Sequence, residues 1–267
     1  MEPLLISLLI YIPLGIVAGF LSGLFGAGGG VVIVPGLVLL FHLQGIVAGS
    51  IMHIAVGTSL ATMVPVALRS LMSHRKYNAD YFEIYRRMVP ALVIGVLAGS
   101  ILAHFLHSRL LEIAFGVFVL CMAFSLLFEE HNQEDAKLHL PGRAGMSLAG
   151  GFIGLQSGLL GIGGSAFSVP FLSHRGVPIR VAVTVSVAIA LTAATLGAVT
   201  FMVTGIYAGG LPVDSIGYVN LPAWIGTTIG GVFIAPLGAS VSRRISSHKL
   251  KNAFAVFLVI VGIKMLW

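Results

Sequence analysis

Two glycine-rich blocks of the chain have the composition of an anion-binding site. Residues 23–30 read GLFGAGGG, residues 158–165 read GLLGIGGS, and Pro35 and Pro170 each follow five residues on. Each glycine in a helix interior costs about 1 kcal/mol relative to Ala, so we expect the first helix to break at 28–30 and to restart at Val31. A restarting helix aims free amide groups and its positive end at the break, where an anion is favoured.

Hydroxyl and amide side chains lie next to both blocks at matched positions. Ser22 and Ser157 precede the two blocks, and Ser59 and Ser186 occupy the following segments. Such donors can bind an oxyanion without the cost of burying a charge. Any single Ser or Thr can instead bond to its own helix, so the matched pairs carry the prediction. The predicted substrate-binding set is Ser22, Gly26, Gly28, Gly29, Gly30, Thr58, Ser59, Gln156, Ser157, Gly161, Gly163, Gly164, Ser165 and Ser186.

The titratable and metal-binding residue types are sparse in the apolar segments. None of the acidic residues lies near the middle of such a segment, which leaves His53 as the candidate for proton coupling. The alternative for His53 is an interfacial histidine at the start of its helix. Cys121 is the single cysteine, so we expect neither a disulfide nor a cysteine metal site, and we predict no metal and no cofactor. No Gly-Lys-Ser/Thr follows the glycine blocks and no strand precedes them, which argues against nucleotide chemistry.

The elements that carry these residues are membrane spans. The sequence is 57% hydrophobic and 9% charged, whereas a soluble domain carries about 25% charged residues. A span needs about 20 apolar residues. We expect a lipid bilayer as the surroundings and no nucleic-acid partner, because the basic residues flank the apolar stretches. These stretches are 4–41, 46–68, 88–106, 110–128, 146–172, 181–203, 219–240 and 250–267.

The chain divides into two related halves. Besides the glycine blocks, residues 55–59 match 182–186, and the spacing of Pro90 to Gly99 matches that of Pro222 to Gly231. The predicted units are a first transmembrane repeat at 1–128, a cytoplasmic linker at 129–143 and a second repeat at 144–267. Such repeats in transporters frame a binding site near the bilayer midplane.

The distribution of charge favours inverted repeats. If each glycine-broken segment returns to the side it entered, only Arg109 and Lys264 fall outside and the other Lys and Arg residues fall inside, as the positive-inside rule requires. We therefore predict an all-α polytopic protein of a bacterial inner membrane, with both termini periplasmic. Each inverted repeat has a Gly-broken helical hairpin plus three transmembrane helices. The inside set is Arg69, Arg75, Lys76, Arg86, Arg87, Lys137, Arg143, Arg175, Arg180, Arg243, Arg244, Lys249 and Lys251.

The paired glycine turns, each with its following proline, and the Thr58-Ser59 block resemble the sulfite exporter TauE/SafE family, also called the toluenesulfonate uptake permease family. The resemblance covers essentially the whole chain. It implies a membrane permease for sulfite, sulfonates, sulfoacetate, thiosulfate or related anions. The chain departs from its own first-half pattern with Ser165 in place of Gly30 and Val185 in place of Thr58, which implies an asymmetric site.

Two other function classes remain open from the sequence. An intramembrane serine protease is suggested by Ser157 in a glycine-rich helix, but such an enzyme needs a histidine within hydrogen-bond reach. A membrane scaffold that moves no substrate is the other class. We expect a transporter and no enzyme. The sequence leaves open the substrate within its class, the direction of transport, the coupling ion and whether the protein forms a homo-oligomer.

Overall fold

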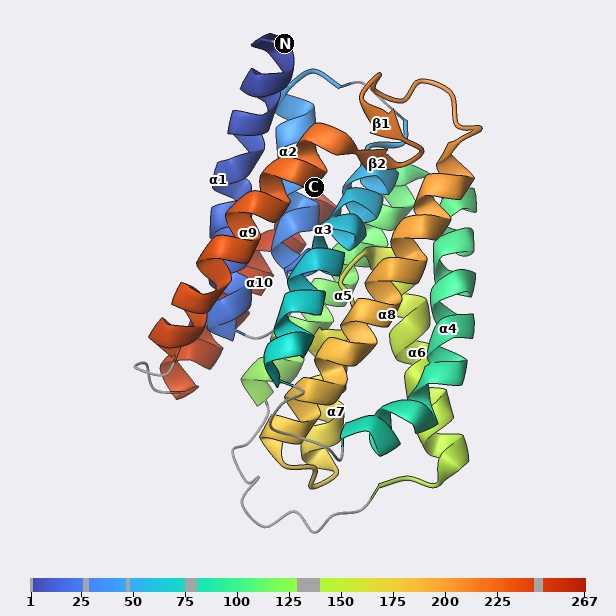
Figure 1. Ribbon diagram of the computed structural model, residues 1–267, viewed down its shortest axis with the longest axis vertical. Helices are drawn as coiled ribbons and strands as arrows, with labels where there is room; N and C mark the ends of the chain where they lie inside the picture. Colours follow the sequence, from blue (N-terminus) through green and yellow to red (C-terminus); the bar gives the residue numbers. More distant parts are fainter. Residues whose placement is uncertain (1, 26–28, 47–48, 75–80, 129–139, 243–246) are drawn as a thin grey trace.

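The computed structural model describes the chain apart from residues 1, 26–28, 47–48, 75–80, 129–139 and 243–246 (Figure 1). The described residues form ten α-helices and two short β-strands. In chain order these are α1 (Glu2–Phe25), α2 (Gly30–Leu43), α3 (Ile51–His74), α4 (Tyr81–Phe105), α5 (Ser108–Phe128), α6 (Arg143–Leu160), α7 (Ser165–His174), α8 (Ile179–Gly205), β1 (Ser215–Ile216), β2 (Val219–Asn220), α9 (Leu221–Ser242) and α10 (Ser247–Leu266).

The helices have the length and apolar composition of membrane spans. Among the described residues, α3, α4, α5 and α8 each contain an apolar stretch long enough to cross a bilayer. Shorter apolar stretches occur in α1, α2, α9 and α10. The protein is therefore a nearly all-helical, multi-pass membrane protein, as the composition predicts.

Both predicted helix breaks are present. The helix α1 ends at Phe25 and α2 begins at Gly30, one residue before the predicted restart at Val31. The helix α6 ends at Leu160 and α7 begins at Ser165. At about 1.5 Å per residue, the ten-residue α7 is about 15 Å long, which is half of a bilayer core. Each broken segment is thus a long arm joined to a short arm, and the break lies well inside the bundle.

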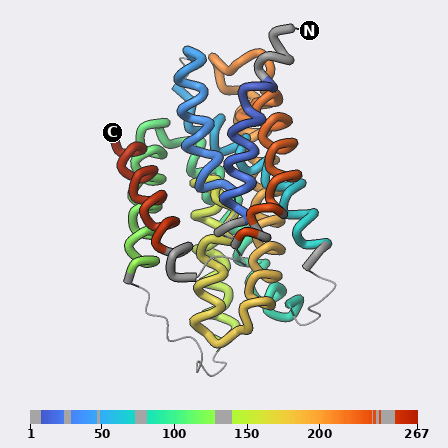
Figure 2. The backbone as a smooth tube through the Cα atoms, turned by 90° about the vertical axis from the view of Figure 1, so that its left-hand side faces the viewer, coloured from blue at the N-terminus to red at the C-terminus, as the bar shows by residue number. Residues whose placement is uncertain are grey.

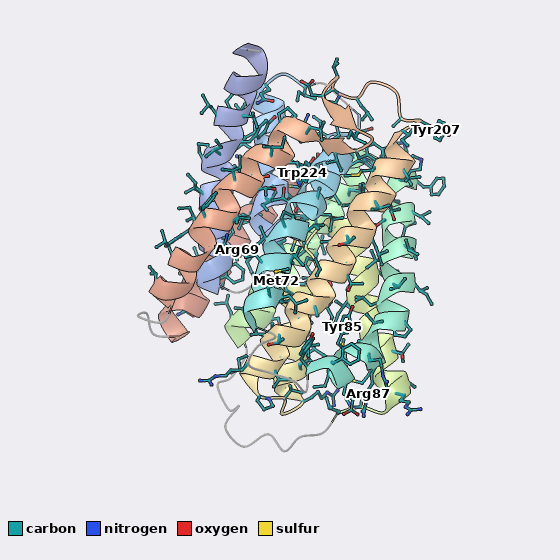
Figure 3. The ribbon with its side chains drawn as sticks, viewed as in Figure 1. Arg69, Met72, Tyr85, Arg87, Tyr207 and Trp224 are labelled. Atoms are coloured by element: carbon teal, nitrogen blue, oxygen red, sulfur yellow. The ribbon has the colours of Figure 1, made fainter. Side chains whose placement is uncertain are left out.

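The two helical hairpins open towards opposite ends of the molecule. The start of α1 and the end of α2 lie at the upper end in Figures 1 and 2, whereas the start of α6 and the end of α7 lie at the lower end. Figure 3 shows Tyr207 projecting at the upper end and Arg87 at the lower end. The tips of both hairpins therefore point towards the interior from opposite sides.

Glycines allow helices from different halves to pack backbone against backbone. The helix α6 packs on α4 through Gly150, Gly154 and Gly158, and an added Cβ at Gly154 would lie 3.0 Å from the amide nitrogen of Val96. The helix α1 packs on α9 in the same way, where an added Cβ at Gly19 would lie 2.6 Å from the Cα of Gly231. Small residues of this kind bring membrane helices close together.

The helices α5 and α10 also pack on each other, and a glycine from each meets the other. An added Cβ at Gly116 would lie 3.0 Å from the carbonyl oxygen of Gly262, and an added Cβ at Gly262 would lie 3.1 Å from the carbonyl oxygen of Gly116. The contact is thus reciprocal. The fifth helix of the first half therefore meets the fifth helix of the second half through one glycine from each.

A short β-hairpin departs from the all-α expectation. The strands β1 and β2 pair antiparallel between α8 and α9, with Ser215 opposite Asn220. Gly217 turns the chain with a φ of 55°, a region that glycine adopts readily. Asn220 then caps α9, because its side-chain oxygen accepts the Ala223 amide at 3.0 Å. The hairpin covers the upper end of α3 and α8 (Figure 1).

Candidate functional site

The tips of the two broken segments are in direct contact. An added Cβ at Gly30 would overlap the carbonyl oxygen of Gly161 and would lie 2.7 Å from the Cα of Ile162. Gly29 lies beside Ser22, and an added Cβ there would be 4.0 Å from the Ser22 Cβ. Gly26 and Gly28, which the sequence also predicts at the site, lie outside the described residues.

The second turn depends on glycine for its backbone conformation. Gly161, Gly163 and Gly164 have φ values of 73°, 74° and 73°, in the left-handed region that side chains disfavour. Gly29 and Gly30 are not in that region. Gly30 of the first turn is therefore needed for close approach, whereas the glycines of the second turn are needed for their backbone conformation.

The helix α3 holds the second turn in place. The Ser59 hydroxyl donates to the Gly161 carbonyl oxygen at 3.0 Å, and both groups are buried. One helical turn further on, the Met63 side chain lies against Gly163, where an added Cβ would be 2.9 Å from its sulfur. On the other side, Ile189 of α8 lies near Gly164. The turn is thus clamped between the central helices α3 and α8.

Three predicted polar side chains next to this turn are buried without a hydrogen-bond partner among the described residues. They are both amide atoms of Gln156 and the hydroxyls of Ser157 and Ser165. Their residues are 5%, 0% and 6% exposed. Leaving such a group unpaired costs about 1–3 kcal/mol, so three together are unusual. Their positions, at the end of α6 and the start of α7, flank the same turn.

Backbone amides add to this set of donors. The N–H groups of Gly164, Ser165 and Ala166 donate to no backbone oxygen among the described residues. They are the first amides of α7, which carry the positive end of the helix dipole. Inside the helix, Pro170 cannot donate to the carbonyl of Ala166. The turn therefore presents several unused donors within one turn of helix.

Two other predicted residues are already hydrogen-bonded. Ser186 of α8 donates to the carbonyl of Ala182 at 2.7 Å, which is the bond to its own helix that any serine can make. Thr58 of α3 accepts the Asn220 amide at 3.0 Å. The Ser186 proton is therefore already given to its own helix, whereas the Thr58 hydroxyl acts as an acceptor in its bond to Asn220.

Asn220 and Thr227 are not among the residues predicted from the sequence. Thr227 of α9 contacts the hydroxyl of Thr62 at 2.8 Å, and Asn220 bonds to Thr58. Both residues join α3 to the second half of the chain. An Asn followed by Leu-Pro is a recognisable helix start, so the capping role of Asn220 could have been predicted. The bond of Asn220 to Thr58 could not have been predicted from the sequence.

His53 lies about 9 Å along α3 from Ser59, at about 1.5 Å per residue. Its Nε2 donates to the Ala103 carbonyl at 2.8 Å, and its ring lies 5.0 Å from that of Tyr218, in the turn between β1 and β2. The Tyr218 hydroxyl in turn contacts Nδ1 of His104 at 3.2 Å, and burial raises the pKa of Tyr218. His53 thus belongs to an aromatic cluster under the β-hairpin, and its proton-coupling role stays a prediction.

Nothing in the described residues builds a metal centre or a serine protease. No three His, Cys, Asp or Glu side chains of that part of the chain gather into a metal site. The Ser157 hydroxyl has no partner there, histidine included. A serine protease needs a base within hydrogen-bond reach of its serine.

The family model described as sulfite exporter TauE/SafE matches residues 11–265 of this chain. The chain belongs to the TauE/SafE family. A probable membrane transporter protein of Haemophilus influenzae is 33% identical over 259 residues, which cover 97% of each chain. A second such protein, from Methanocaldococcus jannaschii, is 28% identical and covers 98% of this chain and 96% of its own length. YunE of Bacillus subtilis, also a probable membrane transporter protein, is 24% identical with 98% of each chain covered. This TauE/SafE protein is therefore a membrane transporter, with a small-molecule substrate and the lipid bilayer as its surroundings.

Proposed function

We propose that this protein is a permease for small sulfur oxyanions, such as sulfite or organosulfonates, which bind at the second glycine turn. The observation that carries the proposal is the set of buried, unpaired groups on Gln156, Ser157 and Ser165. A bound anion would accept hydrogen bonds from Gln156 Nε2 and from the Ser157 and Ser165 hydroxyls, together with the first amides of α7. Gly30, at the tip of the first segment, closes the other side of the site.

The charge around the turn supports an anionic substrate. The chain has no Asp or Glu between Asp135 and Asp214, so α6, α7 and α8 carry no carboxylate. Neutral hydroxyl, amide and backbone donors remain, and these stabilise a negative ligand without a buried counter-charge. The sulfur class follows from the family's description as sulfite exporters. The binding experiment distinguishes among sulfite, sulfonates, sulfoacetate and thiosulfate.

We also propose that residues 1–128 and 144–267 are inverted repeats, joined by a cytoplasmic linker, in a bacterial inner membrane. The opposite orientation of the two hairpins supports this arrangement (Figure 2). The packing of α5 on α10, the fifth helix of each half, supports it as well. In such transporters one repeat moves against the other around a central site, so that the site opens to each side in turn.

The test is ligand binding by the purified protein in detergent. Sulfite, sulfoacetate, taurine, thiosulfate, sulfate and chloride are compared by their effect on the unfolding temperature, since a ligand that binds the native state raises it. We expect at least one sulfur anion to stabilise the wild type more than chloride. We expect Ser157→Ala to lower its affinity ten- to hundredfold, or by about 1.5–3 kcal/mol, which is the value of a hydrogen bond to a charged group.

Ser173→Ala is the matched control. Ser173 is also a buried serine with an unpaired hydroxyl, but it lies eight residues along α7, about 12 Å from Ser165. This variant should bind like the wild type. Equal binding by wild type and Ser157→Ala would contradict the proposed site. Binding of no sulfur anion, with no flux in liposomes, would instead favour the membrane scaffold.

A further inference from the structure

A separate cavity opens on the side of the bundle, away from the glycine turns. It has a volume of about 490 Å³ and lies between α1, α2, the start of α5 and the end of α10. Its walls are mostly apolar and combine buried with exposed side chains. Val38 is 7% exposed, whereas Leu39 and Ile260 are 41% and 61% exposed. The cavity is thus a groove that faces the surroundings of the bundle, and in a membrane protein those surroundings are lipid.

The polar lining of the groove is confined to one end. Arg109 and Glu112 come from the first turns of α5, and Lys264 comes from the last turns of α10. Arg109 bonds to Glu112 at 3.2 Å and donates to the carbonyl of Leu266. Lys264 is exposed and has no acidic partner among the described residues. Arg109 therefore has a carboxylate partner at this end, whereas the Lys264 ammonium has none among the described residues.

These two cations also stand out in the charge distribution of the chain. Arg109 and Lys264 are the Lys and Arg residues that the charge analysis leaves on the face with few positive charges. The positive-inside rule disfavours basic residues on that face. Both cations line the same groove. An anionic group at the membrane interface would pair with both of them there.

We infer that the groove binds an anionic phospholipid of the adjacent leaflet. One acyl chain lies along Leu14, Pro35 and Leu39, and the phosphate lies between Arg109 and Lys264. A phospholipid matches the groove in depth as well as in charge. The cations lie at the ends of their helices, and the apolar wall runs towards the middle of the bundle. This site is independent of the anion site at the glycine turns.

The test is retention of lipid by the purified protein in native mass spectrometry. The probes are phosphatidylglycerol, which is anionic, and phosphatidylcholine, which has no net charge. We expect the wild type to retain phosphatidylglycerol at least several-fold better than phosphatidylcholine. Lys264→Gln should remove most of that preference. Arg69→Gln is the matched control, since Arg69 is an exposed basic residue of α3 outside the groove, and it should retain lipid as the wild type does.

A second pair of variants tests the apolar wall. Leu39→Trp places a large ring in the groove and should reduce retention of both lipids. Leu43→Trp, one turn further along α2, is 74% exposed and lies outside the lining, so it should have no effect. Equal retention of the two lipids by the wild type, or wild-type retention by Lys264→Gln and Leu39→Trp, would overturn the inference. A stable dimer that Leu39→Trp dissociates would overturn it too, because the groove would then be a protein interface.

Discussion

Gly30 of α2 packs against the carbonyl of Gly161, so the tips of the two glycine-broken segments touch although 131 positions separate them in the sequence (161 − 30). Neither residue could carry a side chain in this arrangement. An added Cβ at Gly161 would lie 3.0 Å from the Val56 side chain. The two turns therefore form one structural unit, and a substitution in either turn should affect the structure of the other.

Because of this contact, the Gly30→Ala variant tests whether the two turns form one structural unit. The added methyl group would overlap the Gly161 carbonyl oxygen, and overpacking of this kind costs about 1–3 kcal/mol. We expect a lower unfolding temperature and loss of transport. Gly29→Ala is the control. The atom closest to its added Cβ would be the end of the flexible Ile33 side chain, 3.0 Å away. Equal loss of stability in both variants would contradict the role assigned to the contact.

The hydrogen bond from Ser59 predicts a different effect for Ser59→Ala. Its hydroxyl holds the Gly161 carbonyl, so the substitution should lower stability by about 0.5–1.5 kcal/mol and weaken anion binding by loosening the turn. Ser157→Ala should weaken binding with no loss of stability, since its hydroxyl has no partner among the described residues. Thermal unfolding and binding measured on both variants separate the two roles. A stable Ser59→Ala variant would show that the bond does not position the turn.

Much of the fold could be predicted from the sequence because membrane helices must be long and apolar and because glycine triplets interrupt them. The predicted positions of both breaks agree with the structure. The reciprocal contact of Gly116 and Gly262 could not be predicted, since both residues resemble many other glycines in apolar segments. Pairing across the two halves depends on three-dimensional packing, which local patterns do not encode.

The site was harder to predict than the fold. The matched pair Ser59 and Ser186 has the same place in each repeat, yet Ser59 bonds to the opposite half and Ser186 to its own helix. A hydroxyl group of the predicted site can therefore have one of three roles. It can bond to its own helix, bond to a neighbouring helix or bind the ligand. The hydrogen bonds separate these roles, and the hydroxyls of Ser157 and Ser165, which have no partner among the described residues, are the ones that we propose for the ligand.

The bond between Thr58 and Asn220 predicts a stability difference between two similar variants. Thr58→Val keeps the shape of the side chain but leaves the buried Asn220 amide unpaired, which costs about 1–3 kcal/mol. Thr58→Ser keeps the oxygen and should unfold near the wild-type temperature. Unfolding of the three proteins is compared in the same detergent. Matching temperatures for the Val and Ser variants would show that this bond does not anchor the start of α9.

The last prediction concerns the orientation of the chain in the membrane, which the inverted-repeat proposal fixes. Gly209 and Gly142 suit cysteine labelling, because an added Cβ at either meets nothing within 4 Å. They lie near opposite ends of the bundle, Gly209 after α8 and Gly142 before α6. In a Cys121→Ser background, an impermeant maleimide applied to intact cells should modify Gly209→Cys and leave Gly142→Cys unmodified. Permeabilised cells provide the control, since both cysteines should then react. The reverse pattern in intact cells would place the basic ends of α4, α6 and α8 outside, against the positive-inside rule, and labelling of both sites would contradict a span between them.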